Sequence, residues 1–364
     1  MRALRVALIA SSRYPVNQPF AGGLEAHVWH LAAALRNAGH SVTLFAGPGS
    51  DPELDCELID VRPAPLSTAA RTDISMPAEH FMQEHHAYLD LMLRLSRNYA
   101  DSFDVIHNHS LHYLPVAMTS TLNTPVLTTL HTPPTPWLES AIAAGSSPGR
   151  FAAVSNFTAE AWKHAAGDVD VVHNGVDTDH WRQGPGGQRL IWFGRIVPEK
   201  GAHHAIAAAR AAGMPLVLAG PISDHAYFSE WIEPELGNSV DYLGHLVTDD
   251  LVTAVGNSAV ALVTPQWDEP YGLVVAESLA CGTPVAAYGR GGIPEILTSD
   301  CGRLVPADDV RALTAAIGEA RQLDRASARA RALSHCSQRR MVDRYIELYD
   351  EMACSVTTSS RRAS

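Results

Sequence analysis

The sequence predicts an α/β protein built from two parallel-sheet domains. Short, continuously apolar runs, such as residues 6–10, alternate with helical segments along the chain, and such runs are typical of strands covered on both faces. A segment rich in glycine and proline, residues 182–188, leaves six predicted strands on either side. With 364 residues and 46% hydrophobic content, the chain is long enough for two domains with full cores.

The first strand leads through a loop into a helix that begins near Gly22 and Gly23 and ends at Gly39. The two glycines let a substrate approach the backbone, and the helix N-terminus favours an anion. Their spacing does not match G-x-G-x-x-G, so we predict no dinucleotide site there. The following segments are predicted to be a strand, a mobile loop rich in Pro and Asp, and one long helix, at residues 41–46, 50–75 and 77–99.

Histidines gather at two further strands of the first half. His107 and His109 share a face of the strand at 104–109 and, with His112, suggest a metal site. No further ligand type follows at a usual spacing, so we expect no metal there. His131 ends the strand at 124–131, and the carboxyl ends of parallel strands are where functional groups gather. A lone histidine at a strand end is more often structural.

Two more strands, at 151–155 and 169–173, complete the first half, and Ser155 with Asn156 is expected to cap the helix between them. The second half begins with a strand at 190–194, and Arg195 and Lys200 follow it. An arginine and a lysine so placed can converge on one diphosphate, although a solvated basic loop is the simpler interpretation. The remaining strands are predicted at 215–219, 240–243, 259–263, 285–288 and 302–305, and the last helices at 310–323 and 338–352.

The stretch from Trp267 to Gly282 combines two carboxylates with the start of an apolar helix. Pro270 and Gly272 predict a helix that begins near Tyr271 or Gly272, and its first amides, at Gly272, Leu273 and Val274, favour a phosphate. Glu269 precedes the helix and Glu277 lies inside it. Both could be ordinary surface charges, but an unpaired carboxylate in so apolar a helix is costly.

Composition excludes several classes of protein. The formal net charge of −12 argues against a nucleic-acid surface or a polybasic membrane patch. The five cysteines are scattered and odd in number, which predicts neither a disulfide framework nor a zinc ribbon and fits a reducing cytoplasm. The apolar run at 6–10 is too short for a signal core, and no run approaches the roughly 18 residues of a membrane span.

Several motifs resemble those of one enzyme family. Residues 269–277 resemble the E-x7-E signature of retaining, nucleotide-sugar-dependent glycosyltransferases of the GT-B fold, family 4. Four further segments also resemble motifs of that family, at residues 22–27, 173–177, 278–285 and 291–295. The resemblance implies two Rossmann-like domains that face each other across a deep cleft. It implies an acceptor domain at 1–182, a nucleotide-sugar domain at 183–337 and a helix at 338–354 that crosses back. The polar composition of residues 355–364 predicts a disordered tail.

The resemblance also implies roles for individual residues. His131, Glu269, Arg195 and Lys200 would be catalytic, with Arg195 and Lys200 on the diphosphate, Glu269 on the sugar hydroxyls and His131 near the anomeric carbon. Glu277 would bind the ribose, and Gly244, His245 and Leu246 the nucleobase. The other donor-binding residues would be Gly22, Gly23, Tyr271, Gly272, Leu273 and Val274, with His27 and His109 on the acceptor side. Neither a metal nor a cofactor is expected.

We therefore expect a retaining hexosyltransferase that moves a sugar from a nucleoside diphosphate to a hydroxyl, with a soluble small-molecule acceptor slightly favoured over a membrane lipid. A nucleotide-sugar epimerase of the same fold and a non-catalytic nucleotide-sugar-binding homologue remain alternatives. A phosphorylase would need a pyridoxal-phosphate lysine, which the sequence does not identify. A two-carboxylate hydrolase is disfavoured because both glutamates lie at a phosphate-binding helix of the donor domain.

Overall fold

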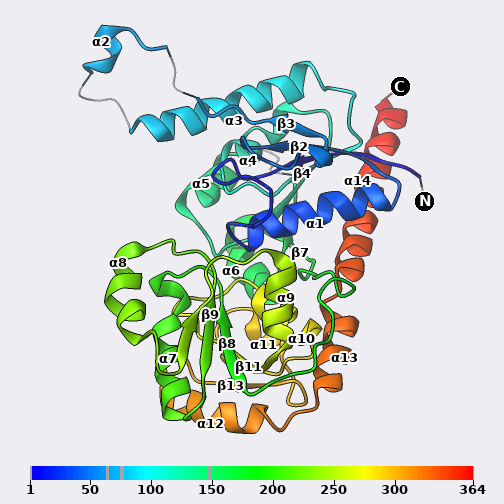
Figure 1. Cartoon of the computed structure of the whole chain (residues 1–364). Helices are drawn as coiled ribbons and strands as arrows, with labels where there is room; N and C mark the ends of the chain where they lie inside the picture. The colour runs from blue at the N-terminus through cyan, green and yellow to red at the C-terminus, as the bar shows by residue number, and fades with distance from the viewer. Residues whose placement is uncertain (1, 63–64, 74–77, 146–148, 364) are drawn as a thin grey trace.

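The computed structural model describes residues 2–62, 65–73, 78–145 and 149–363. Within them the chain forms two parallel sheets, one from each half, so the predicted α/β fold with two Rossmann-like domains is confirmed (Figure 1). The first sheet has the strand order β3-β2-β1-β4-β5-β6-β7 and the second β10-β9-β8-β11-β12-β13. In each sheet the strand order reverses beside the first strand, which is where α/β proteins bind ligands.

The first domain carries seven strands among its described residues. They are β1 (Arg5–Ile9), β2 (Ser41–Ala46), β3 (Cys56–Leu58), β4 (Val105–Asn108), β5 (Val126–Leu130), β6 (Arg150–Ala153) and β7 (Asp170–Val171). Its helices and short turns are α1 (Gly23–Asn37), η1 (Pro52–Leu54), α2 (Thr68–Arg71), α3 (Glu79–Arg97), α4 (Leu114–Ala117), η2 (Thr119–Thr121), α5 (Pro136–Ala144) and α6 (Asn156–Ala166).

The second domain carries six strands among its described residues. They are β8 (Arg189–Phe193), β9 (Leu216–Ala219), β10 (Val240–Tyr242), β11 (Ser258–Val263), β12 (Val285–Tyr288) and β13 (Gly302–Val305). Its helices and turns are η3 (Pro198–Lys200), α7 (Ala202–Ala211), α8 (His225–Tyr227), η4 (Phe228–Ile232), η5 (Glu233–Glu235), α9 (Thr248–Gly256), α10 (Leu273–Ala280), α11 (Ile293–Ile296), α12 (Val310–Ala320), α13 (Arg325–His335) and α14 (Gln338–Ala363).

Helices cover both faces of each sheet, which is why the strands are apolar throughout. In β1, Val6 and Leu8 pack with α1 and α14 on one face, while Ala7 and Ile9 pack with α3 on the other. Strand β8 repeats this pattern. One of its faces packs with α10 and α13, and the other packs with α7 and α12. The alternation follows from the two-residue period of a strand.

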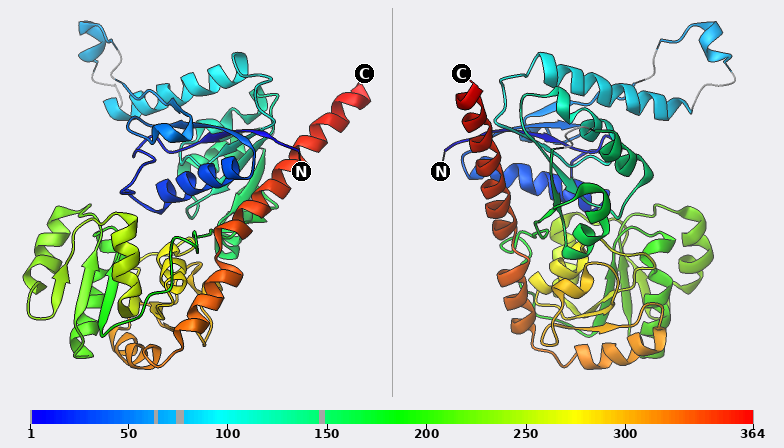
Figure 2. Two further views of the ribbon diagram at one scale, coloured as in Figure 1. Left: turned by 45° about the vertical axis from the view of Figure 1, so that its right-hand side comes forward. Right: turned by 180° about the vertical axis from the view of Figure 1, so that it is seen from behind.

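The last helix, α14, crosses from the second domain to the first (Figure 2). Its buried side chains Met341, Tyr345, Leu348, Tyr349 and Met352 belong to the core of the first domain. The two domains therefore share one structural element.

Two expectations differ from the structure. The segment 50–75 was expected to be a loop, but it contains β3, which pairs with β2 at the edge of the sheet, and the short helix α2; residues 63–64 and 74–75 lie outside the described residues. A three-residue edge strand has too little pattern for a sequence signal. Disorder was expected at 355–364, but α14 continues to Ala363. A helix that is already formed propagates easily where neither Gly nor Pro interrupts it.

Candidate active site

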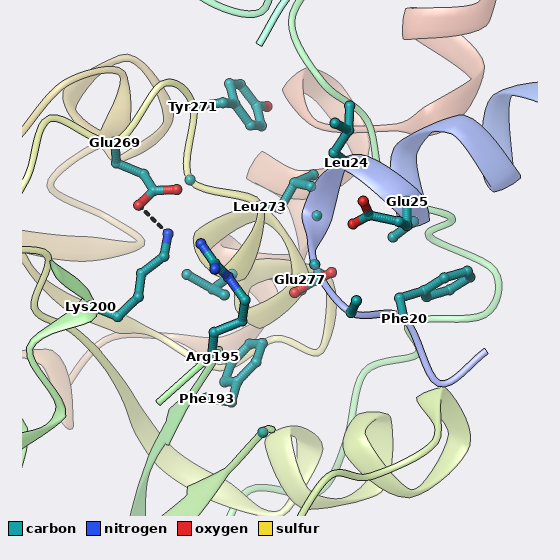
Figure 3. Close-up of a pocket in the computed structure, with 18 of the residues that line it drawn as sticks. Phe20, Leu24, Glu25, Phe193, Arg195, Lys200, Glu269, Tyr271, Leu273 and Glu277 are labelled. Atoms are coloured by element: carbon teal, nitrogen blue, oxygen red, sulfur yellow. Dashed lines mark hydrogen bonds and ion pairs between the residues drawn. The ribbon is translucent and has the colours of Figure 1, made fainter. Parts of the chain in front are cut away.

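A cavity of about 490 Å³ lies between the two domains, at the carboxyl ends of both sheets. Its walls come from the β1–α1 loop and His131 of the first domain, and from β8, η3 and the turn before α10 of the second (Figure 3). Of the predicted site residues, those that line it are Gly22, Gly23, His131, Arg195, Lys200, His245, Leu246, Glu269, Tyr271, Gly272, Leu273, Val274 and Glu277. The fold thus gathers thirteen residues that are separated widely in the sequence.

Lys200 and Glu269 form an ion pair in this cavity. Lys200 Nζ lies 2.6 Å from Glu269 Oε2, and Trp267 Nε1 donates to the same oxygen over 3.0 Å (Figure 3). Both charged side chains are mostly buried, with 23% and 15% of their surface exposed. Gly201 follows Lys200 and ends η3 with a φ of +66°, a conformation that favours glycine. A Cβ at this position would lie 2.1 Å from the Thr264 carbonyl oxygen, so the backbone is closely packed there. The pair is therefore held by backbone packing.

Arg195 extends from the end of β8 into the same space (Figure 3). Its guanidinium lies 3.8 Å from Glu199, a loose contact that leaves its donors available. Glu25, in the first turn of α1, lines the opposite wall and is 6% exposed. Burial raises the pKa of Glu25, and the charge of Arg195 opposes this rise. Glu25 was not among the predicted site residues, although a carboxylate two positions after Gly22-Gly23 was a usable signal.

The turn that carries Glu269 is shaped by glycines. Gly272, with φ of +107°, is the N-cap of α10, which confirms the predicted start of the helix. The first hydrogen bonds within α10 run from the Val275 and Ala276 amides to the Gly272 carbonyl. The amides of Leu273 and Val274 come before them and have no acceptor within the helix. Such amides at the wall of a cavity suit a phosphate.

Glu277 lies one turn into α10 and also lines the cavity. Ala276 and Leu279 lie beside it in the helix, and desolvation by burial raises the pKa of Glu277 to about 8. The side chain is therefore largely protonated at neutral pH. A protonated carboxyl can donate one hydrogen bond and accept others, which fits a hydroxyl-bearing ligand.

The predicted histidines lie in two layers. His131 lines the cavity, whereas His27 and His109 lie behind it, 4% and 0% exposed, and do not line it. His109 Nδ1 and His131 Nε2 are 2.9 Å apart. Burial lowers the pKa of His27 to about 3 and that of the other two well below the usual value, so all three are neutral. The acceptor-side role of His27 and His109 stays a prediction.

Gly244 does not line the cavity; its carbonyl accepts a hydrogen bond from the Gly220 amide over 2.9 Å. The neighbouring His245 does line it, and its Nε2 lies 3.1 Å from the Phe20 carbonyl oxygen of the first domain. The nucleobase role of residues 244–246 stays a prediction.

A second contact joins the domains beside the turn of Glu269. The Ser155 hydroxyl donates to the Pro270 carbonyl over 2.5 Å and also caps α6, as predicted. The Glu295 carboxylate accepts from the amides of Asn156 and Phe157. Desolvation acts to raise the pKa of Glu295, but its hydrogen bonds, with His173 first among them, lower it to about 2. The turn is thus anchored to the first domain as well as to its own.

Two family models match the chain in succession. The model described as Glycosyltransferase Family 4 matches residues 21–180, and the model described as Glycosyl transferases group 1 matches residues 178–332. The chain belongs to glycosyltransferase family 4. The boundary between the matches falls at the junction between the two sheets, so each domain of this glycosyltransferase carries its own part of the family pattern.

Relatives of this glycosyltransferase extend over most of its length. It is 26% identical over 359 residues to a glycogen synthase of Mycobacterium tuberculosis, which covers 86% of this chain and 85% of that protein. It is 28% identical over 327 residues to a phosphatidyl-myo-inositol mannosyltransferase of Mycolicibacterium smegmatis, with 81% and 80% covered. The fold is similar to that of HepE of Anabaena, crystallised with UDP-glucose, at 18% identity and a TM-score of 0.75 over 96% of this chain and all of that one. These similarities establish the GT-B fold and glycosyltransferase activity.

Among the described residues of this glycosyltransferase, none of the helices has the length and apolar character needed to cross a membrane.

Proposed function

We propose that this glycosyltransferase moves a sugar from a nucleoside diphosphate to a hydroxyl of a soluble small molecule, with retention of the anomeric configuration and without a metal ion. The observation that carries the proposal is the Lys200–Glu269 pair in the cavity, 2.6 Å apart, next to the open amides of Leu273 and Val274. The Lys200 ammonium and the amides can bind a diphosphate, and the Glu269 carboxylate can bind the hydroxyls of an attached sugar.

In the proposed reaction the bond between the anomeric carbon and the diphosphate oxygen breaks, and charge develops on the diphosphate. Arg195, Lys200 and the α10 amides would stabilise that charge more in the transition state than in the ground state. The acceptor oxygen attacks from the face that the diphosphate leaves, and the acceptor proton passes to a departing phosphate oxygen. Glu269 would orient the sugar hydroxyls, and Glu277 would contact the ribose.

The assignment of the donor to the second domain rests on where the charges lie. Lys200, Arg195 and Glu269 all come from that domain, while His131 and the glycines of the β1–α1 loop face them from the first. HepE, whose fold is similar, was crystallised with UDP-glucose, which supports a nucleotide-sugar donor. The two named relatives are a synthase of glycogen and a mannosyltransferase acting on phosphatidyl-myo-inositol, so acceptors differ widely within the family.

The first test is donor binding. We would measure the thermal midpoint of the full chain with UDP, GDP, ADP and dTDP, then with the sugar conjugates of whichever nucleotide binds. Lys200→Ala should abolish the shift. Lys163→Ala is the matched control, because Lys163 is 67% exposed, pairs with Glu160 and does not line the cavity. An unchanged shift in Lys200→Ala would contradict its role.

The second test is turnover. With a donor and acceptor in hand, Lys200→Ala and Glu269→Ala should each lower kcat/KM by roughly 10²–10³, the usual effect of removing one transition-state donor. NMR of the first product should show the donor's anomeric configuration, and excess chelator should leave the rate unchanged. An inverted product would reject the retaining mechanism.

The same assay separates the alternatives. An epimerase would consume the nucleotide-sugar in the absence of any acceptor. A non-catalytic homologue would bind the donor and release it unchanged with every acceptor offered.

A further inference from the structure

Three imidazoles meet behind the active-site cavity. His27 lies in the second turn of α1, His109 directly after β4 and His131 directly after β5. One ring nitrogen of each lies within 4.8 Å of one ring nitrogen of the other two. The neighbouring strands β4 and β5 end at the same edge of the sheet, and α1 begins there, so three distant parts of the sequence reach one point.

Hydrogen bonding does not explain the position of His27 in this group. His27 is 4% exposed, and neither of its ring nitrogens has a partner among the described residues. A buried polar group without a partner is costly and needs an explanation. The single contact between ring nitrogens within the group joins His109 Nδ1 to His131 Nε2. His27 therefore presents an unused nitrogen to two neighbouring imidazoles.

The arrangement suits a transition-metal ion. Three neutral imidazoles with no carboxylate select Zn²⁺, Co²⁺, Ni²⁺ or Cu²⁺ over Mg²⁺ or Ca²⁺. Tetrahedral Zn²⁺ with bonds of about 2.0–2.1 Å needs ligand nitrogens roughly 3.3 Å apart, which small rotations of the three rings can supply. His131 is partly exposed to the cavity, so the fourth position opens toward solvent.

The surroundings of His109 complete such a site. A metal on His109 Nδ1 leaves Nε2 as a donor, and His107 Nδ1 lies 3.1 Å from it. His107 is itself held by Thr129 Oγ1, 2.7 Å from Nε2, and by the Tyr349 hydroxyl, 2.6 Å from Nδ1. Metal-bound histidines are usually oriented by a carboxylate, a backbone carbonyl or a water, and here the His107 imidazole nitrogen takes that place.

We propose that His27, His109 and His131 bind a transition-metal ion of the Zn²⁺ class, and that the bound ion inhibits sugar transfer. Inhibition follows because the ion holds the His131 imidazole, which otherwise faces the cavity, and places a divalent charge at its wall. This second part rests on the proposed function. The metal-free enzyme is the active form, which agrees with a transfer reaction that needs no metal.

Metal binding is tested without reference to activity. We would strip the full chain with chelator, titrate it with Co²⁺, and follow visible ligand-field absorption, stoichiometry by calorimetry and displacement by Zn²⁺. One ion per chain is expected, and His27→Gln and His131→Gln should each weaken binding by at least about tenfold. His112→Gln is the matched control: it lies three residues from His109 but outside the group, and it should bind as the unaltered chain does.

The outcomes separate the two parts. Absence of Co²⁺ binding, or binding that both His27→Gln and His131→Gln retain in full, would overturn the site. If one variant fails to fold, as judged by its thermal midpoint, the other decides, together with the number of histidine nitrogens around Co²⁺ by X-ray absorption. Saturating Zn²⁺ should lower transfer at least tenfold, chelator should restore it, and in His27→Gln the ratio of rates with and without Zn²⁺ should be near one. Metal binding without inhibition would overturn the inhibitory part alone, and a chain that transfers no sugar would overturn the proposed function while the Co²⁺ result stands.

Discussion

Glu269 and Glu277 are eight residues apart, and their surroundings differ. Glu269 is paired with Lys200 and accepts from Trp267, which stabilises the carboxylate. Glu277 has apolar neighbours, and its pKa of about 8 reflects desolvation. Glu269 therefore accepts hydrogen bonds from Lys200 and Trp267, while the raised pKa of Glu277 allows its carboxyl to donate one.

The raised pKa of Glu277 predicts how stability depends on pH. The folded state keeps a proton that the unfolded chain releases above its ordinary pKa of 4.5, so this group's contribution to the free energy of unfolding falls as pH rises from about 4.5 to about 8. The slope should approach roughly 1.4 kcal/mol per pH unit within that window. Glu277→Gln, which is neutral throughout, should lack this component when urea unfolding is compared at pH 5 and pH 8.

Glu160→Gln is the control for this comparison, because Glu160 is 76% exposed and should leave the slope unchanged. A stability difference between Glu277→Gln and the unaltered chain that is the same at both pH values would show that Glu277 ionises normally.

At the scale of elements, the turn before α10 and the loop before α11 are packed backbone against backbone. The Gly292 amide donates to the Glu269 carbonyl over 2.8 Å. A Cβ at Gly291 would lie 2.0 Å from that carbonyl oxygen, and one at Gly292 would lie 2.6 Å from the Pro270 carbonyl oxygen. The glycines are needed here so that the loop can hold Glu269 in the cavity.

Gly291→Ala should therefore impair catalysis beyond its effect on backbone strain. The residue has φ of +60°, and the added methyl must push the Glu269 backbone away from Lys200. Gly213→Ala is a matched control, since Gly213 has φ of +63° and nothing within 4 Å of its Cβ position. Both variants should lose about 1–2 kcal/mol of stability from the left-handed conformation, but kcat/KM should fall at least tenfold in Gly291→Ala alone. Equal rates in the two variants would mean that the loop does not position Glu269.

At the scale of the molecule, α14 and the Glu295 contact tie the domains together. Tyr345 and Tyr349 of α14 are fully buried in the first domain, and the Tyr349 hydroxyl reaches His107. Glu295 of the second domain holds the N-terminus of α6 in the first. The cavity is built from both domains, so its shape depends on these two connections.

Tyr345→Ala should destabilise the chain by roughly 3–5 kcal/mol, the usual cost of deleting a buried aromatic side chain. We expect a thermal midpoint lowered in the transition that reports the first domain. Arg339→Ala on the same helix is the control, because Arg339 is 92% exposed. If Tyr345→Ala unfolds like Arg339→Ala, α14 is not an integral part of the first domain.

Much of the site was predictable because its residues sit beside strong local signals. Lys200 and Glu269 adjoin a glycine and a proline, Gly272 lies at the turn itself, and Glu277 is a carboxylate inside an apolar helix. The structure places all four in the cavity. Glu25 was missed, although it follows Gly22-Gly23 closely, because its place in the cavity wall comes from packing. Strand β3 was missed because three residues at a sheet edge carry almost no period.

The sequence by itself determined the two α/β units, the junction between them, the start of α10 and the charges available to bind a phosphate, because each depends on patterns within a few residues. Only the tertiary structure decided which groups meet. It paired Lys200 with Glu269 and raised the pKa of Glu277 by burial. It also placed His27 and His109 beside His131 and anchored the Pro270 turn to Ser155. Distances and desolvation between residues far apart in the chain arise from packing, and packing has no local sequence signal.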